Sequence, residues 1–102
     1  MSGEFEVIAA RELTAAGDGV QGSRRVLVEI GRPVPAATSE GDWTCEYRIT
    51  GLTEEHRMQI FGVDGIQAIQ NALIAVGGAL RGAHDPPRLA LSFDGQENLL
   101  FP

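Results

Sequence analysis

Apolar and polar residues alternate along several stretches of this chain, as they do in half-buried strands of an antiparallel sheet. The alternation is clearest at 43–49, where Trp43, Cys45, Tyr47 and Ile49 share one face. This pattern predicts a meander with one buried and one polar face. Further strands are expected at 5–13, 24–32, 55–63 and 89–93, with a short edge strand at 99–101.

The strand at 43–49 and the one after it have patterns that fix their pairing. A turn at Leu52 and Thr53 sets apolar residues opposite one another, and a slip of one residue would destroy that match. The pairs expected across this hairpin are Ile49 with His56, Tyr47 with Met58, and Cys45 with Ile60.

The only long helical pattern runs from Asp64 to about Ala83. Asp64 followed three residues later by Gln67 resembles a capping box, and Gly82 with the prolines after it ends the helix. A stripe of large apolar side chains is expected to face the sheet: Ile66, Ile69, Leu73, Val76 and Leu80.

The stretch 31–42 contains Pro33, Pro35 and Gly41 and is expected to be a loop. Asp94 and Gly95 form a turn signal near the C-terminus. The sequence therefore predicts a single α+β domain over 1–102. Its mainly antiparallel meander of four to five strands packs on one long helix and ends in a C-terminal β-hairpin.

The formal net charge of −6 is strongly acidic for 102 residues. It argues against nucleic acid or an anionic membrane as a partner, because both require a basic surface. No apolar run approaches the roughly 20 residues of a membrane span, and the first residues lack the features of a signal peptide. A cytoplasmic location is the expectation.

Residues with reactive side chains form no recognised catalytic or metal-binding pattern. Cys45 lies on the apolar face, where burial opposes thiolate formation, and the predicted register places His56 about four residues away from it. Neither His56 nor His84 has further ligands at a metal-binding spacing. No catalytic, metal-binding or cofactor-binding residue is therefore assigned.

A stripe of small residues suggests an interaction surface on the predicted helix. It lies beside the large apolar stripe, and small side chains allow another backbone to approach closely. The residues of this candidate interface are Ala68, Ala72, Ala75 and Ala79. The main hypothesis is therefore a non-catalytic protein-interaction module: a homodimer, an accessory subunit or an inhibitor-type partner. The bland alternative is that the loop from Gly31 to Asp42, or the sheet itself, covers this stripe.

A second hypothesis belongs to a different class, a small-ligand-binding or enzymatic domain. Its pocket would lie between the helix N-terminus and the strand ends. The lining residues would be Trp43, Tyr47, Asp64 and Gln67. Aromatic residues on a sheet face are more often core than ligand platform, and Asp64 is also explained as a helix cap.

Two motifs are similar to those of a family of small uncharacterised bacterial proteins, a domain of unknown function. The first is W-x-C-x-Y-x-I-x-G-L from Trp43 to Leu52, and the second is G-V-D-x-x-Q-A from Gly62 to Ala68. The resemblance covers most of the chain from Val26 onward. It implies a bacterial cytoplasmic origin and carries over no activity.

Overall fold

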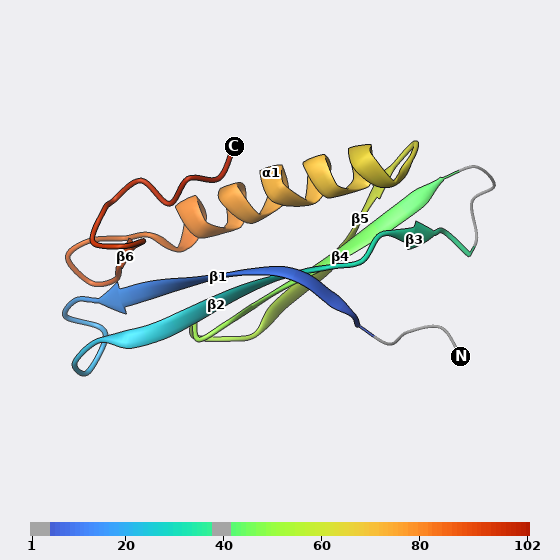
Figure 1. Ribbon diagram of the computed structural model, residues 1–102. Coiled ribbons are helices and arrows are strands. Elements are labelled where there is room, and N and C mark those ends of the chain that lie inside the picture. Colours follow the sequence, from blue (N-terminus) through green and yellow to red (C-terminus); the bar gives the residue numbers. More distant parts are fainter. Residues whose placement is uncertain (1–4, 38–41) are drawn as a thin grey trace.

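The computed structural model describes residues 5–37 and 42–102 and confirms the α+β class. Within these residues, a single helix packs on one face of an antiparallel sheet (Figure 1). The described strands number six rather than four to five. The elements are β1 (Val7–Ala16), β2 (Arg24–Gly31), β3 (Val34–Pro35), β4 (Trp43–Thr50), β5 (His56–Gly62), α1 (Gly65–Ala83) and β6 (Ala90–Ser92).

The strands β1, β2, β4 and β5 form the predicted meander, and β6 pairs with β1 at the far side of the sheet. Every pair is antiparallel. β3 pairs with Trp43 and Thr44 of β4. Because these two residues pair with β5 on their other side, β3 lies on the same side of β4 as β2 and continues its line. The prediction of a loop throughout 31–42 is thus wrong at β3, while residues 38–41 lie outside the described residues.

The hairpin of β4 and β5 has the register expected from the alternating pattern. Ile49 lies opposite His56, Tyr47 opposite Met58, and Cys45 opposite Ile60. The side chains of Cys45, Tyr47 and Ile49 are buried. Hydrophobic alternation therefore fixed this pairing correctly, because any slip would have turned these side chains towards water.

Helix α1 begins with the reciprocal capping box that the sequence predicts. An Asp64 carboxylate oxygen accepts the backbone N–H of Gln67 at 2.8 Å. The Gln67 side-chain oxygen accepts the backbone N–H of Val63, also at 2.8 Å. Two otherwise unpaired donors are satisfied in this way, which fixes where the helix starts relative to the end of β5.

The helix is rotated about its axis relative to the sequence expectation. Ala68 and Ala72 are 0% exposed and face the sheet, whereas Ile66 is 69% exposed. Ile69 and Leu73 are only partly buried. The prediction that the large apolar stripe covers the sheet is therefore wrong at Ile66 and confirmed for Val76 and Leu80. It is confirmed in part for Ile69 and Leu73, which pack against the core without being fully buried.

The close approach of α1 to the sheet explains this rotation. A Cβ atom on Gly62, the last residue of β5, would overlap the backbone of Ala68. Only small side chains fit between backbones this close, so alanines face the sheet and larger residues flank the contact. The rest of the core comes from β1, β2, β4 and the segment around β6: Leu13, Ala15, Val26, Val28, Ile30, Leu89 and Leu91 are its main members.

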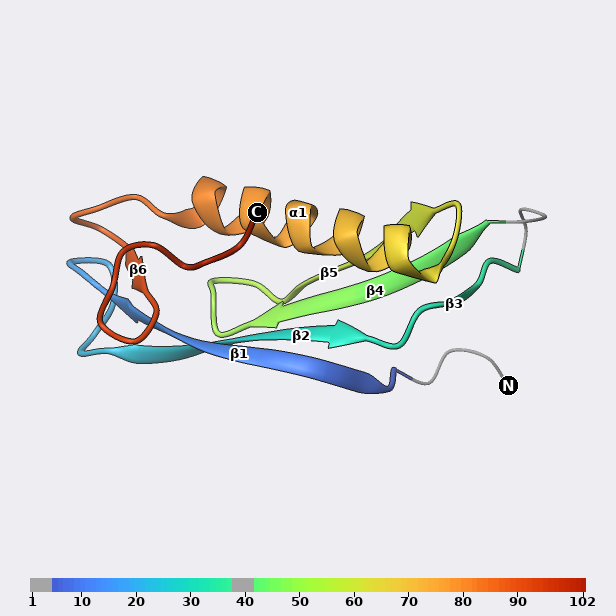
Figure 2. The same cartoon turned by 45° about the horizontal axis from the view of Figure 1, so that its top comes forward.

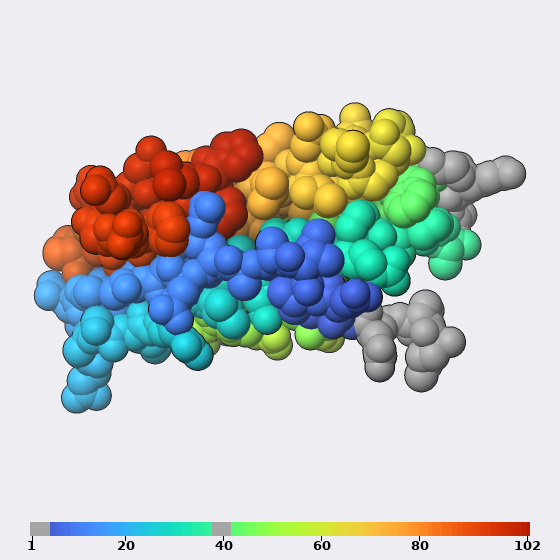
Figure 3. Space-filling model, viewed as in Figure 1, coloured from blue at the N-terminus to red at the C-terminus, as the bar shows by residue number. Residues whose placement is uncertain are grey.

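The C-terminal segment does not form the short edge strand predicted at 99–101. The turn at Asp94 and Gly95 is present, with positive φ angles of 51° and 77°, and Phe93 bridges Gln96 across it. Beyond this point the chain is irregular, so the predicted C-terminal hairpin is limited to that bridge. Figures 1 and 2 show the segment returning beside α1, and Figure 3 shows it lying against β1.

Candidate functional site

The four residues of the predicted interface do not form an exposed stripe. Ala68 and Ala72 are buried under the helix against the chain's own sheet, so the prediction that they contact a second chain is wrong. Ala75 and Ala79 are partly buried and pack on the same core. The bland alternative, that the sheet covers the alanines, is the one the structure supports.

The alternative pocket near the helix N-terminus does not collect its four residues around a cavity. Asp64 and Gln67 use their side-chain oxygens to cap α1. Tyr47 is buried, and its hydroxyl lies 2.7 Å from the His56 Nε2 atom. Trp43 packs beside the first turn of the helix, near Gly65. These polar groups satisfy the fold's own hydrogen bonds.

Cys45 is fully buried, as the sequence indicates. Burial raises the pKa of its thiol, and its sulfur donates to the carbonyl oxygen of Gly31 at 3.4 Å. His56 is bonded to Tyr47 rather than to the thiol. A neutral, enclosed thiol of this kind is a packing residue and not a nucleophile.

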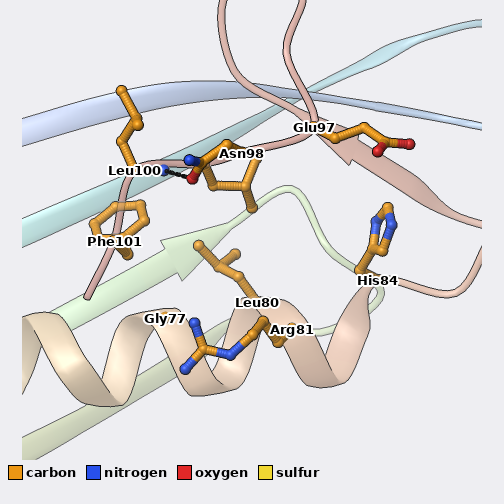
Figure 4. A pocket seen from close by; sticks show the side chains of 9 residues that line it. Gly77, Leu80, Arg81, His84, Glu97, Asn98, Leu100 and Phe101 are labelled. Atoms are coloured by element: carbon orange, nitrogen blue, oxygen red, sulfur yellow. Dashed lines mark hydrogen bonds between the residues drawn. The ribbon is translucent and has the colours of Figure 1, made fainter.

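A cavity of about 210 Å³ lies between the C-terminal half of α1 and the C-terminal segment (Figure 4). Leu80, Leu99 and Phe101 give it an apolar surface, and polar side chains stand around it. Its remaining lining residues are Gly77, Arg81, His84, Glu97, Asn98 and Leu100. The sequence reasoning missed this cavity, because its walls come from segments with no shared periodic pattern.

Arg11 on β1 holds the C-terminal segment in place. Its guanidinium carbon lies 4.6 Å from the ring centroid of Phe93 and 4.7 Å from that of Phe101. One guanidinium nitrogen donates to the carbonyl oxygens of Leu99 and Leu100, at 2.9 and 3.0 Å. We call this set of contacts the Arg11 clamp. Cation–π attraction and charged hydrogen bonds act together here.

A third feature is the free outer edge of β1. Strand β6 pairs only with Thr14, Ala15 and Ala16. Within 5–37 and 42–102, no strand pairs with the outer side of Val7–Leu13. At about 3.3 Å per residue this edge is about 20 Å long. Val7 and Ile8 are 41% and 48% exposed along it, and Ala9 and Ala10 are also exposed.

These features belong to a fold whose family the sequence identifies. A family model described as a domain of unknown function (DUF6968) matches residues 9–102. The chain belongs to this family. The match covers the two motifs at 43–52 and 62–68, the residues of the Arg11 clamp and the cavity, so all of these lie within the DUF6968 domain. No curated protein and no solved structure matched the chain.

Two further observations concern metal ions and membranes. Over the part of the chain that the structure describes, no three histidine, cysteine or acidic side chains gather as a metal site would require. No helix in that part of the chain combines the length and the apolar character that crossing a bilayer demands.

Proposed function

We propose that this chain is a non-catalytic protein-interaction module that assembles by pairing the outer edge of β1 with β1 of a second copy. The observation that supports this most is the row of exposed small and apolar residues, Val7–Ala10, along a strand edge that no described strand covers. A free strand edge presents unpaired backbone donors and acceptors, which a second strand satisfies.

The features that usually prevent another strand from pairing with an exposed edge are weak along this strand. Long charged side chains commonly keep other strands away, but Arg11 is turned inward into the Arg11 clamp. Glu12 is paired with Arg25 on the neighbouring strand at 3.0 Å. The bulge between Val7 and Ala9 is the one protective irregularity.

Charge favours a second copy at this edge rather than elsewhere. The chain carries −6 overall, so most contacts between two copies bring like charges together. The β1–β2 region is an exception, because residues 6–32 contain four acidic and four basic residues and are neutral. These are Glu6, Glu12, Asp18 and Glu29, with Arg11, Arg24, Arg25 and Arg32.

The other free edge of the sheet, on β5, is a poorer candidate. Arg57 and Gln59 extend long polar side chains from it, and both are exposed. The Phe61 carbonyl oxygen already accepts a hydrogen bond from the Asn71 side chain at 2.9 Å. Met58, which is 49% exposed on β5, therefore offers a control position matched in exposure to Ile8.

Sedimentation equilibrium tests the proposal, with concentrations up to about 1 mM because a single strand pair is a small interface. We expect a dimer for the natural chain, a dimer dissociation constant at least tenfold higher for Ile8→Lys, and an unchanged dimer for Met58→Lys. Circular dichroism verifies that both variants fold. A monomer at every concentration, or equal weakening by both substitutions, would contradict pairing through β1.

A further inference from the structure

The outer edge of β1 restricts how a second copy can pair with it. Among the described residues this edge is unpaired from Val7 to Leu13, because β6 occupies the same side of the strand at 14–16. Two copies of one strand pair antiparallel about a twofold axis, so each residue faces the residue equally far from the axis on the other copy. The whole unpaired stretch pairs with itself when Ala10 lies on the axis, since Val7 then faces Leu13.

Charged side chains disfavour the two neighbouring registers. Opposing residues of an antiparallel pair point to the same face of the sheet, so the axis passes through a residue and not between two. With the axis at Ala9, Glu12 would face Glu6 of the second copy. With the axis at Arg11, that residue would face itself. Like charges directly opposite each other are destabilising. With Ala10 on the axis, Arg11 faces Ala9 of the second copy instead.

The Arg11 clamp holds an exposed leucine beside this same stretch of β1. Arg11 donates to the carbonyl oxygen of Leu100 at 3.0 Å, and the Leu100 backbone N–H donates to the Asn98 side-chain oxygen at 2.9 Å. The φ angle of Leu100 is 62°, in the left-handed region that leucine rarely adopts. Its side chain is 59% exposed and points away from α1 (Figure 4). Two hydrogen bonds thus fix a strained backbone that presents a leucine to solvent, and strain of this kind is typical of functional positions.

We propose that Leu100 is part of the β1 interface, where it covers Ala9 of a second copy that is paired with Ala10 on the twofold axis. Ala9 and Arg11 lie on the helix-bearing face of the sheet, because they pair with the buried residues Ile30 and Val28. Ala9 is small and exposed, so it leaves room for a leucine. The symmetry forms the contact twice. This inference rests on the proposed pairing through β1 and adds to it the register and a second contacting segment.

Disulfide cross-linking of single-cysteine variants tests the register. With Ala10 on the axis, its two copies are about 5 Å apart between Cα atoms, which suits a disulfide. The two copies of Ala9 would be about 8 Å apart, which is too far. We therefore expect copper–phenanthroline oxidation to give a covalent dimer for Ala10→Cys and little for Ala9→Cys. The natural chain is the control, since its own Cys45 is fully buried.

Leu100→Asn tests the second contact separately. Asparagine adopts a positive φ more readily than leucine, so this variant keeps the backbone while it removes the apolar contact. We expect sedimentation equilibrium to show a dimer dissociation constant higher by about fivefold or more, with no loss of stability in urea unfolding of the monomer. Ile66→Asn on α1 is the control, because Ile66 is 69% exposed and should leave the dissociation constant unchanged.

The outcomes separate this inference from the pairing on which it rests. A dimer that Ile8→Lys weakens, but that cross-links through Ala9→Cys in place of Ala10→Cys, would overturn the register and leave pairing through β1 intact. A dimer that Leu100→Asn weakens no more than Ile66→Asn would overturn the Leu100 contact alone. A natural chain that stays monomeric at every concentration would overturn both proposals.

Discussion

The apolar face of the sheet is covered by two unlike structures. Over β4 and β5 lies a regular helix, which approaches so closely that alanines form the contact. Over β1 lies an irregular C-terminal segment, held by a guanidinium between two aromatic rings. The first half is stabilised by packing of small residues, and the second by a few specific contacts of one side chain. The two halves should therefore respond differently to substitution.

The largest effect should come from a charge placed under the helix. Ala72→Glu puts a carboxylate where the side chain is 0% exposed, and we expect a loss of about 4 kcal/mol or more in the free energy of unfolding. Ile74→Glu, two residues away and 53% exposed in the natural chain, should change it by no more than about 0.5 kcal/mol. Urea unfolding of both variants measures the difference, and a tolerated Ala72→Glu would show that the helix does not face the sheet as described.

The next effect should come from the other half of the face. Arg11→Ala removes both ring contacts and both carbonyl bonds of the Arg11 clamp, with an expected loss of about 2 kcal/mol. Arg11→Lys should recover only part of it, because a compact ammonium cannot stack between two rings as a planar group does. Arg57→Ala is the surface control. If Arg11→Ala and Arg57→Ala had equal free energies of unfolding, the Arg11 clamp would contribute nothing to stability.

Two neighbouring glycines in α1 sharpen the comparison further. Gly77→Ala should destabilise the chain by about 1 kcal/mol, because its Cβ would meet the Pro102 oxygen and push the C-terminal segment away. Gly78→Ala should stabilise it by about 0.8 kcal/mol, since nothing lies within 4 Å and alanine is the better helix former. Thermal unfolding measures both changes, and the same sign for both would contradict the close passage over Gly77.

The smallest effect concerns pH and the helix-covered half. Burial raises the pKa of the Cys45 thiol above 9.0 and that of the Tyr47 phenol above 10.0. Each neutral group then contributes stability below its unfolded pKa, and that contribution is lost as pH rises through the higher folded pKa. Unfolding free energy should fall above about pH 9, by at most about 1.4 kcal/mol per pH unit for each group.

Cys45→Ala separates the two groups in this alkaline range. The variant should lose the part of the decrease that begins near pH 9 and keep the part that begins near pH 10. Urea unfolding at several pH values compares it with the natural chain. An identical pH dependence in both proteins would mean that the thiol is not held neutral by burial.

The helix-covered half was largely predictable from the sequence. Alternation gave the β4–β5 register, and the Asp64–Gln67 spacing gave the start of α1, because both signals are local. The rotation of α1 was not predictable, since hydrophobicity alone favours Ile66 over Ala68. What decides it is the backbone approach between Gly62 and Ala68, which is a property of the tertiary packing.

The other half and the candidate site could not be read from the chain. Arg11 contacts Leu99, which is 88 residues away, and no periodic pattern links such distant partners. The cavity depends on that contact, because the C-terminal segment supplies Glu97, Leu99 and Phe101 to it. Irregular segments have no periodic pattern of apolar residues. The expectation of a return strand at 99–101 therefore rested only on a short apolar run.

The proposed assembly depends on the free edge of β1, which lies outside both of these covered halves. Hydrogen exchange by NMR tests it directly, through the amides of 7–12 that point away from β2. We predict that these amides are protected well above the dissociation constant of the dimer and exchange rapidly well below it, while the outward amides of β5 exchange rapidly at both concentrations. Rapid exchange along β1 at every concentration, or protection gained on β5 instead, would contradict pairing through β1.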